Sequence, residues 1–286
     1  MSPKISVLMP VYKTNKEFLI ESIKSIINQT FKDFELIILD DCPEDPREDV
    51  IKSFNDNRIK YYKNEKNLGI SASRNKLIDL SLGEYLAVFD HDDISLPERL
   101  EKEAKYLDEN KSVGVVSCQM KFINSSHITP YPCTNQLIKG TMLTLCCIAH
   151  TASMIRKSVL IKNNIRYEED FSPCEDYMLW ARLMDVTLFH NLNEILVLYR
   201  DSDQNTSHNS AAIMSDKTTI IREMLLAKHP HIKQLSLRKY IYIKLIFGIP
   251  LLKIRSTLSS KKYYLFGFIP LLQIKEEYKD PHSNGI

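Results

Sequence analysis

Short apolar segments rich in β-branched residues alternate with segments of helical periodicity through residue 199, and this alternation limits the fold more than any other feature. The apolar segments predict strands over 5–12, 34–39, 58–62, 84–89, 113–123 and 195–199, and the periodic segments predict helices over 17–29, 47–54, 71–80, 97–109 and 174–184. This alternation is typical of an α/β domain with a mainly parallel sheet flanked by helices. Residues 124–150 show neither pattern clearly, so no element is predicted there.

The composition indicates a globular protein of a reducing compartment. Of the 286 residues, 44% are hydrophobic and 26% are charged, which is ordinary for a globular chain. The N-terminus runs directly into the first apolar segment without the pattern of a secretory signal, so we expect a cytoplasmic location. The 6 cysteines form no C-x-x-C pair and have no zinc-ligand spacing, which favours free thiols over disulfides or a metal site.

Acidic residues follow two of the predicted strands. Asp40 and Asp41 end one strand, and "AVFDHDD" places Asp90, Asp92 and Asp93 after another. Ligands of open α/β sheets bind at this end of the strands. If the chain stays extended there, Asp90 and Asp92 lie on the same side and the intervening His points away. Two such carboxylates suit Mg²⁺ or Mn²⁺ bound together with a phosphate. The alternative is that Asp92 and Asp93 are solvated residues before a helix N-terminus.

Five segments, in order, carry a resemblance to a known family. They are "ISVLMPVYK" at 5–13, "QTFKDFELIILDD" at 29–41, "NLGISASRN" at 67–75, "YLAVFDHDD" at 85–93 and "EDYMLW" at 175–180. Together they resemble the bacterial family 2 glycosyltransferases of the GT-A fold. The resemblance covers roughly residues 3–210, which implies a catalytic domain over 1–210. It also implies inverting transfer of a sugar from a nucleotide sugar, with a divalent metal, Mn²⁺ or Mg²⁺, as cofactor.

The resemblance assigns roles to individual residues. It implies that Asp176 is the general base, which takes the proton of the acceptor hydroxyl, and that Asp92 binds the metal. The residues implied to bind the nucleotide sugar are Pro10, Val11, Tyr12, Asp41, Arg74, Asp90 and Arg200. The alternative for Arg74 is a helix-surface ion pair, and without the family context Glu175 and Asp176 are better explained as acidic residues that favour a helix N-terminus.

Three residues are candidates for the acceptor side. They are His150, Glu175 and Trp180. His150 is also consistent with a hydrogen-bonded core histidine, and Trp180, the only tryptophan, with a residue of the helix core.

Three departures from the family pattern affect the prediction. Ser202 stands two residues after Arg200, where many relatives have a histidine, so a histidine contact to the diphosphate is not expected. Cys42-Pro43 replaces the usual Gly-Ser beside the nucleotide base. The chain also lacks the Q-x-x-R-W signature of processive synthases, which favours single sugar addition.

The C-terminal region differs from the rest in charge. Residues 233–275 contain nine of the 38 Lys and Arg residues and none of the 36 Asp and Glu residues. They include a repeat, "FGIPLLKIR" at 247–255 and "FGFIPLLQIK" at 266–275. We therefore expect residues 211–286 to form a separate, helical and amphipathic region that binds an anionic membrane surface. The alternative is that this region packs on the domain, and nucleic acid is not expected as a partner.

These features favour a metal-dependent hexosyltransferase at the inner face of the cytoplasmic membrane. We expect it to move one sugar, most simply from a UDP-linked donor, to a glycan or lipid-linked acceptor in the synthesis of cell-surface polysaccharide such as lipopolysaccharide. One alternative is a phosphatase or phosphotransferase with a D-x-D nucleophile. Such phosphatases usually have a Thr two positions after the second Asp, whereas Ile94 and Ser95 follow Asp93 here. Another is a membrane-associated scaffold that has lost activity.

Overall fold

The computed structural model describes residues 2–201, 210–232, 240–244, 250–257, 260–265 and 269–275. The chain divides into one unit over 1–228 and a second over 229–286.

The first unit is built on an eight-stranded mixed sheet in the order β3-β2-β1-β4-β7-β6-β8-β5. The strands are β1 (Ile5–Val11), β2 (Phe34–Asp40), β3 (Ile59–Lys63), β4 (Tyr85–Val88), β5 (Ile94–Ser95), β6 (Val113–Phe122), β7 (Ser153–Arg156) and β8 (Leu188–Tyr199). β1 to β4 pair in parallel, and the antiparallel β7 joins β4 to the parallel pair β6 and β8. The chain passes from β1 outward to β3 and then returns to β4. The strand order therefore reverses between β1 and β4, which places a ligand-binding crevice at the carboxyl ends of these two strands.

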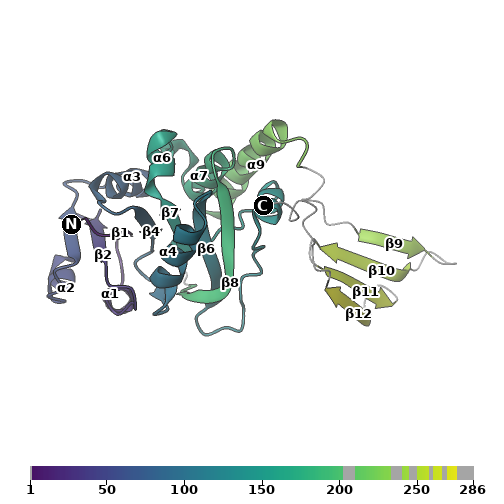
Figure 1. Ribbon diagram of the computed structural model, residues 1–286, viewed down its shortest axis with the longest axis horizontal. Coiled ribbons are helices and arrows are strands. Elements are labelled where there is room, and N and C mark those ends of the chain that lie inside the picture. The colour runs from purple at the N-terminus through teal and green to yellow at the C-terminus, as the bar shows by residue number, and fades with distance from the viewer. Residues whose placement is uncertain are drawn as a thin grey trace. The chain divides into compact units, whose positions relative to one another are not determined.

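Helices cover both faces of this sheet (Figure 1). They are α1 (Lys16–Ile27), α2 (Glu48–Lys52), α3 (Ile70–Leu80), α4 (Arg99–Glu109), α5 (Asn135–Met142), α6 (Lys157–Lys162), α7 (Glu175–Leu183) and α9 (Ala211–Lys228), with short 3-10 helices η1 (His150–Ala152) and η2 (Glu169–Phe171). Helix α1 begins after Asn15, whose side chain accepts hydrogen bonds from the N–H groups of Glu17 and Phe18. Such capping satisfies N–H groups that have no partner inside the helix.

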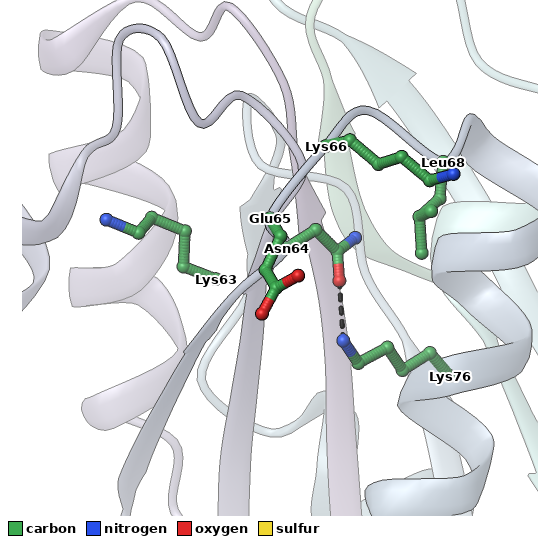
Figure 2. Close-up of a pocket in the computed structure, with 6 residues that line it drawn as sticks. All are labelled: Lys63, Asn64, Glu65, Lys66, Leu68 and Lys76. Carbon is green, nitrogen blue, oxygen red and sulfur yellow. Dashed lines mark hydrogen bonds between the residues drawn. The ribbon is translucent and has the colours of Figure 1, made fainter.

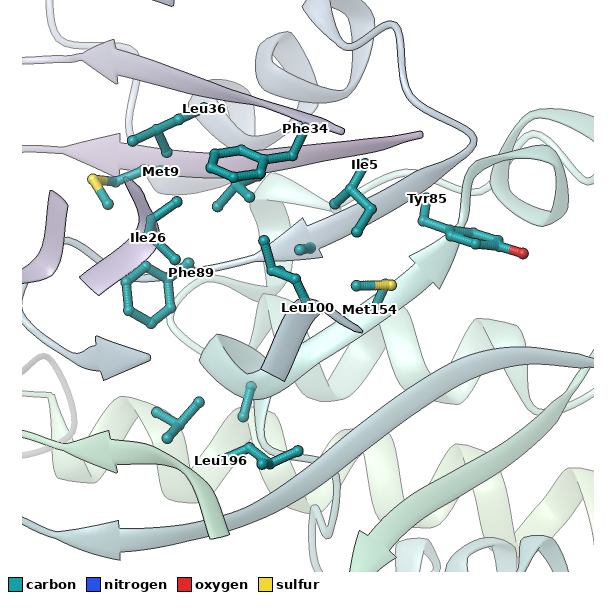
Figure 3. Close-up of a cluster of buried hydrophobic side chains, with 14 of the residues drawn as sticks. Ile5, Met9, Ile26, Phe34, Leu36, Tyr85, Phe89, Leu100, Met154 and Leu196 are labelled. Carbon is teal, nitrogen blue, oxygen red and sulfur yellow. The ribbon is translucent and has the colours of Figure 1, made fainter. Parts of the chain in front are cut away.

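One continuous hydrophobic core joins α1, α2 and α4 to the sheet (Figure 3). Leu19, Ile23 and Ile26 of α1 are fully buried, as the helical spacing predicts. On α4, Leu100 and Leu107 pack into the same core. This core fixes α1 and α4 beneath the strands that lead to the acidic residues.

Gln29 sets the end of α1 and the start of α4. The sequence predicts that α1 continues to residue 29, but the helix ends at Ile27 and Gln29 is fully buried beyond it. Its amide donates to the Leu96 carbonyl and accepts from the N–H of Leu100. The second bond satisfies one of the N–H groups left open at the beginning of α4.

The predicted strands and helices through α4 are present, and two expectations need correction. The sequence predicts the last strand over 195–199, but β8 already begins at Leu188. Its first half alternates only weakly between apolar and polar residues and is held by its pairing with β6. β4 ends at Val88 and residues 91–92 form a turn, so Asp90 and Asp92 do not lie on one side of an extended segment. Their relative placement depends on that turn.

The second unit contains a four-stranded antiparallel sheet in the order β12-β11-β10-β9. Its strands are β9 (Tyr240–Lys244), β10 (Pro250–Thr257), β11 (Ser260–Leu265) and β12 (Ile269–Lys275). The expected helical character of residues 211–286 therefore holds for α9, but the described residues after 239 form strands. The alternation of basic and apolar residues at Lys253, Ile254 and Arg255 has the strand period. Both repeats lie partly outside the described residues. Within the described part of the chain, no helix is long and apolar enough to cross a membrane.

Candidate active site

Arg74 joins two acidic segments that are far apart in the sequence. This residue of α3 donates from Nη1 to Glu175 Oε1 at 2.5 Å and from Nη2 to Asp90 Oδ1 at 3.3 Å. Arg74 is 9% exposed and Glu175 is 6% exposed. Burial alone lowers the pKa of Arg74, but the charges of Asp90 and Glu175 outweigh it and raise that pKa above its ordinary value. Arg74 is therefore a buried cation that holds the segment after β4 beside the start of α7.

Asp176 follows Glu175 in the first turn of α7. Its Oδ1 accepts a hydrogen bond from the N–H of Tyr177 at 2.6 Å. Burial and the neighbouring charge of Glu175 raise the pKa of Asp176 to about 6, whereas Arg74 lowers it. A carboxylate with a pKa close to neutral is suited to accept a proton in a transition state near pH 7.

Asp92 is a partly exposed carboxylate in the turn after β4. Its side chain is 24% exposed. Burial and the charge of Asp90 raise the pKa of Asp92, whereas His91 and Arg200 lower it. The cluster thus retains an excess of negative charge at the carboxyl end of β4, which a cation would offset.

Asp93 and Arg200 attach this acidic loop to β8. Asp93 is 1% exposed, and its Oδ1 accepts a hydrogen bond from the N–H of Arg200 at 2.8 Å. The Arg200 guanidinium donates to the Asp92 carbonyl at 2.8 Å and to Glu21 of α1 at 2.6 Å, and it lies 4.0 Å from the Phe18 ring centroid. Arg200 thus connects the acidic loop to α1 and to the end of β8.

Among the described residues, no three His, Cys, Asp or Glu side chains form a complete metal site. Asp90 and Asp92 nevertheless fit a divalent cation, because Mg²⁺ and Mn²⁺ prefer oxygen ligands and are commonly held by one or two carboxylates plus substrate phosphates and water. Burial is the main cause of the raised pKa of Asp92, and the negative charge of Asp90 adds to it. The donor set therefore suits a cation that binds together with a diphosphate.

Asp41 organises the loop between β3 and α3. Its carboxylate, 4% exposed, accepts hydrogen bonds from Asn64 Nδ2 at 2.7 Å and from the N–H groups of Leu68 and Gly69 at 2.8 and 2.9 Å. Gly69 has φ 82°, a conformation that favours glycine. The Asp41 carboxylate is thus engaged by three donors of the protein, and a nucleotide base would meet it through its remaining acceptor capacity or through the loop that it holds.

A cavity of about 570 Å³ lies along this loop. Its lining residues are Lys63, Asn64, Glu65, Lys66, Leu68 and Lys76. Figure 2 shows Lys76 reaching from α3 to Asn64, with a distance of 2.6 Å between Nζ and Oδ1, whereas Lys63 points away from both. The cavity has a net basic lining and borders the Asp41 network through Asn64.

The end of β1 contributes three further predicted residues. Pro10 and Val11 are buried and pair with Leu39 and Asp40 of β2. Tyr12 follows the strand and is 40% exposed. Of these three, only Tyr12 presents a large accessible surface to a ligand.

His150 and Trp180 lie behind Arg74. The His150 Nε2 atom is 2.8 Å from the Tyr167 hydroxyl oxygen, and its ring centroid is 5.9 Å from that of Trp180. Burial and the charge of Arg74 hold the pKa of His150 well below its ordinary value, so the imidazole is neutral. Trp180 is 0% exposed. Contact between Trp180 and an acceptor sugar would require this ring to leave the core.

Thr151 and Tyr167 belong to the site but have no recognisable signal in the sequence. Thr151 Oγ1 accepts a hydrogen bond from the N–H of Asp90 at 3.0 Å, and the Tyr167 ring lies 5.7 Å from the Arg74 guanidinium. Both residues come from the region between β6 and α7, where the sequence predicts few elements. The only hint is that polar residues there interrupt apolar runs.

Comparison with known proteins agrees with this arrangement. The sequence profile of the family described as "Glycosyl transferase family 2" matches residues 6–163. An uncharacterized glycosyltransferase of Methanocaldococcus jannaschii is 36% identical over 207 residues, which cover 69% of this chain and 71% of the relative. The O-antigen biosynthesis glycosyltransferase WbnJ of Escherichia coli is 33% identical over 232 residues, 77% of this chain and 89% of the relative.

Two solved structures have the same fold. TarS 1-349 of S. aureus, in complex with UDP-GlcNAc, superposes with a TM-score of 0.68 at 22% identity, over 82% of this chain and 72% of that one. The mannosyltransferase PcManGT of Pyrobaculum calidifontis, in complex with GDP-Man and Mn²⁺, gives 0.61 at 12% identity, over 81% and 65%. The mixed sheet with its strand reversal between β1 and β4 is thus the GT-A fold, and the chain belongs to glycosyl transferase family 2.

Proposed function

We propose that this protein is a metal-dependent, inverting glycosyltransferase that moves one hexose from a UDP-sugar to a glycan or lipid-linked acceptor during synthesis of cell-surface polysaccharide. The observation that carries the proposal is the bridge made by Arg74. It brings Asp90, at the donor end of β4, close to Glu175 and to the neighbouring Asp176. Asp90 of the acidic donor site and the α7 segment that carries Asp176, whose pKa is raised, thus lie on either side of the buried Arg74.

On the donor side, Asp90 would bind the ribose and Asp92 would hold Mn²⁺ or Mg²⁺ together with the diphosphate. The metal, when bound, would neutralise the charge that develops on the leaving nucleoside diphosphate. Arg200 and Asp93 would keep the loop in place through their hydrogen bonds to it. The exposed Tyr12 and the loop organised by Asp41 would flank the nucleotide base. The printed ligands of TarS and PcManGT, UDP-GlcNAc and GDP-Man, support a nucleotide-sugar donor.

On the acceptor side, Asp176 would act as the general base. The acceptor hydroxyl gives its proton to the Asp176 carboxylate while its oxygen forms a bond to the anomeric carbon. The bond from that carbon to the diphosphate oxygen breaks, and the diphosphate leaves with the electron pair. Attack opposite to the leaving group inverts the anomeric configuration. Glu175 would hold Arg74 in place, and His150 would support Arg74 from behind as a neutral group.

Membrane association rests on the basic C-terminal region. Nine Lys and Arg residues without an acidic residue over 233–275 favour binding to anionic lipid, each basic group contributing about 1 kcal/mol. A peripheral position on the inner face of the cytoplasmic membrane would bring a lipid-linked acceptor to a domain that takes its donor from the cytosol. We likewise propose residues 1–210 as the catalytic part and 211–286 as the docking part.

Release of UDP from a panel of UDP-sugars, with and without Mn²⁺ or Mg²⁺ and with a lipid-linked acceptor, tests the proposal. We expect metal-dependent release with at least one donor and a single sugar added to the product. Absence of release with every donor, together with membrane binding, would favour the scaffold. Release of inorganic phosphate from a phosphomonoester would favour the D-x-D phosphatase. A thermal-shift panel of nucleotide sugars with Mn²⁺ would identify the donor.

A further inference from the structure

A fully buried ion pair lies under the strand that carries Asp90. Arg99 and Glu103, one turn apart on α4, are both 0% exposed. Arg99 Nε lies 3.3 and 3.2 Å from the two Glu103 carboxylate oxygens. The pair lies within the hydrophobic core, whose neighbouring residues on α4 are Leu100, Ala104 and Leu107.

The rest of the Arg99 guanidinium faces the place where two strands separate. β4 and β7 pair from Tyr85 to Ala87, and the next residues along them, Val88 and Ser153, are outside the ladder. Arg99 Nη2 donates to both of their carbonyls, at 2.9 Å to Val88 and 3.3 Å to Ser153. Arg99 therefore lies at the end of the β4–β7 ladder and donates to two carbonyls beyond the last residue pair of that ladder.

The acidic loop begins directly beyond this point. Phe89 follows Val88, and its ring centroid lies 5.3 Å from the Arg99 guanidinium. The N–H of Asp90 then donates to Thr151 Oγ1, on the other side of the opening, at 3.0 Å. The path of the chain into Asp90 is thus defined by contacts on both sides of the separated strands.

Stability alone does not account for an ion pair at this position. Taking two charges out of water costs several kcal/mol per ion, and replacing a buried pair by apolar residues of similar size is often neutral or stabilising. Arg99 Nη1 also has no hydrogen-bond partner among the described residues, which adds to the cost. An apolar pair would fill the core but could not donate to two carbonyls.

We propose that Arg99 and Glu103 form a positioning pair that holds β4 and β7 apart at Val88 and Ser153 and thereby sets the placement of Asp90 and Asp92. Glu103 orients the guanidinium, and Arg99 fixes the two carbonyls. The consequence for donor and metal binding rests on the proposed function, whereas the effect on the loop itself does not. Neither residue would touch the substrate, since both side chains are fully buried.

The double variant Arg99→Met/Glu103→Leu in the full chain tests the pair. We expect it to fold, because neither charge is left unpaired in the core. In hydrogen–deuterium exchange, residues 87–93 should exchange about tenfold faster while 100–109 of α4 stay protected, because the opening is local. The dissociation constant for UDP with Mn²⁺ should rise by about 10- to 100-fold, the usual effect of losing residues that orient metal ligands.

A matched control lies on the exposed side of the same helix. Lys105→Met/Glu109→Leu removes an exposed i,i+4 pair with side chains 73% and 62% exposed, and it should change neither measurement. If the core double variant does not fold, Arg99→Lys takes its place, since it keeps the charge but replaces the planar guanidinium, whose Nε and Nη2 atoms reach Glu103 and the two carbonyls separately, by a single nitrogen. Unchanged exchange over 87–93 in whichever core variant folds would overturn the proposal.

If the native protein binds no UDP with Mn²⁺, the proposed function fails, and the exchange result still decides the role of the pair.

Discussion

Among single residues, Arg74 is the cation that pairs with two carboxylates of the candidate active site. Two carboxylates from segments more than 80 residues apart, Asp90 and Glu175, bond to its guanidinium. The side chains of Arg74 and Glu175 are nearly inaccessible to water, whereas that of Asp90 is partly exposed. Removing one member of a buried pair leaves an uncompensated charge, which is far more costly than the pair is stabilising. Arg74 should therefore affect both folding and activity.

We predict that Arg74→Met lowers the free energy of unfolding by about 3–5 kcal/mol, because Glu175 would stay buried without its cation. Urea unfolding followed by circular dichroism measures the change. Arg182→Met is the control, since its pair with Glu168 is 44% and 34% exposed and such pairs contribute less than about 1 kcal/mol. Equal losses in both variants would mean that Arg74 is only a surface ion pair.

The raised pKa of Asp176 predicts the pH dependence of transfer. A general base must be ionised, and the pKa of Asp176 is raised to about 6. kcat/KM should therefore be constant above that pH and fall as the pH drops through it, about tenfold per unit. Glu175→Gln removes the negative charge that helps to raise this pKa, so the fall should move to lower pH. Glu168→Gln, at an exposed pair, should leave the profile unchanged, and an identical profile in Glu175→Gln would argue against Asp176 as the base.

At the scale of elements, the strands and helices before residue 110 could be predicted because each has its own periodic pattern. The buried segment "FELIIL" and the helical spacing of Leu19, Ile23 and Ile26 are local signals, and the structure places both as expected. The acidic residues after β2 and β4 could be placed at one end of the sheet for the same reason, since parallel strands share that end.

The remaining elements depend on contacts that are distant in sequence. β7 has four residues and α6 has six, which is too short for a periodic signal, and β7 is fixed by its pairing with β4 and β6. The turn at 91–92 could not be predicted either, because it is held by Thr151 and Arg200 from outside the segment. The specific bridge from Arg74 to Glu175 is a tertiary contact with no sequence period.

Gly83 is required where β4 begins beside β1. A Cβ atom at this position would lie 2.5 Å from the backbone nitrogen of Ser6, and that backbone is fixed by the sheet. We predict that Gly83→Ala lowers the free energy of unfolding by about 1–3 kcal/mol, as overpacking does. Leu82→Ala is the control, because Leu82 is 64% exposed and should change stability by less than about 0.5 kcal/mol. Equal stability of the two variants would mean that β4 can shift away from β1.

At the scale of the whole molecule, the charges are divided between the two parts of the chain. Residues 233–275 contain nine basic residues and no acidic residue, whereas the acidic cluster after β4 lies in the first unit. A net charge of +2 therefore conceals a basic region and an acidic remainder of the chain. Anionic lipid would attract the basic region while the acidic site remains available for a cation and a nucleotide sugar.

We predict that a chain truncated after residue 232 no longer sediments with anionic vesicles, whereas the full chain does so and is released by salt, because screening weakens attraction between surface charges. Vesicles of neutral lipid are the control and should bind neither protein. Equal sedimentation of the truncated and full chains with anionic vesicles would show that the C-terminal region does not dock the protein.

We propose that Asp92 and Asp176 have separate roles on the two sides of Arg74, Asp92 in donor binding and Asp176 in proton transfer. Isothermal titration of UDP-sugar with Mn²⁺, combined with turnover, measures both roles in Asp92→Asn and Asp176→Asn. We expect Asp92→Asn to lose metal-dependent donor binding, and Asp176→Asn to bind donor like the native protein while kcat falls by about 10²- to 10⁴-fold. Asp79→Asn, at a carboxylate that is 62% exposed, should match the native protein in both. Equal loss of donor affinity in Asp92→Asn and Asp176→Asn would contradict the assignment of separate roles.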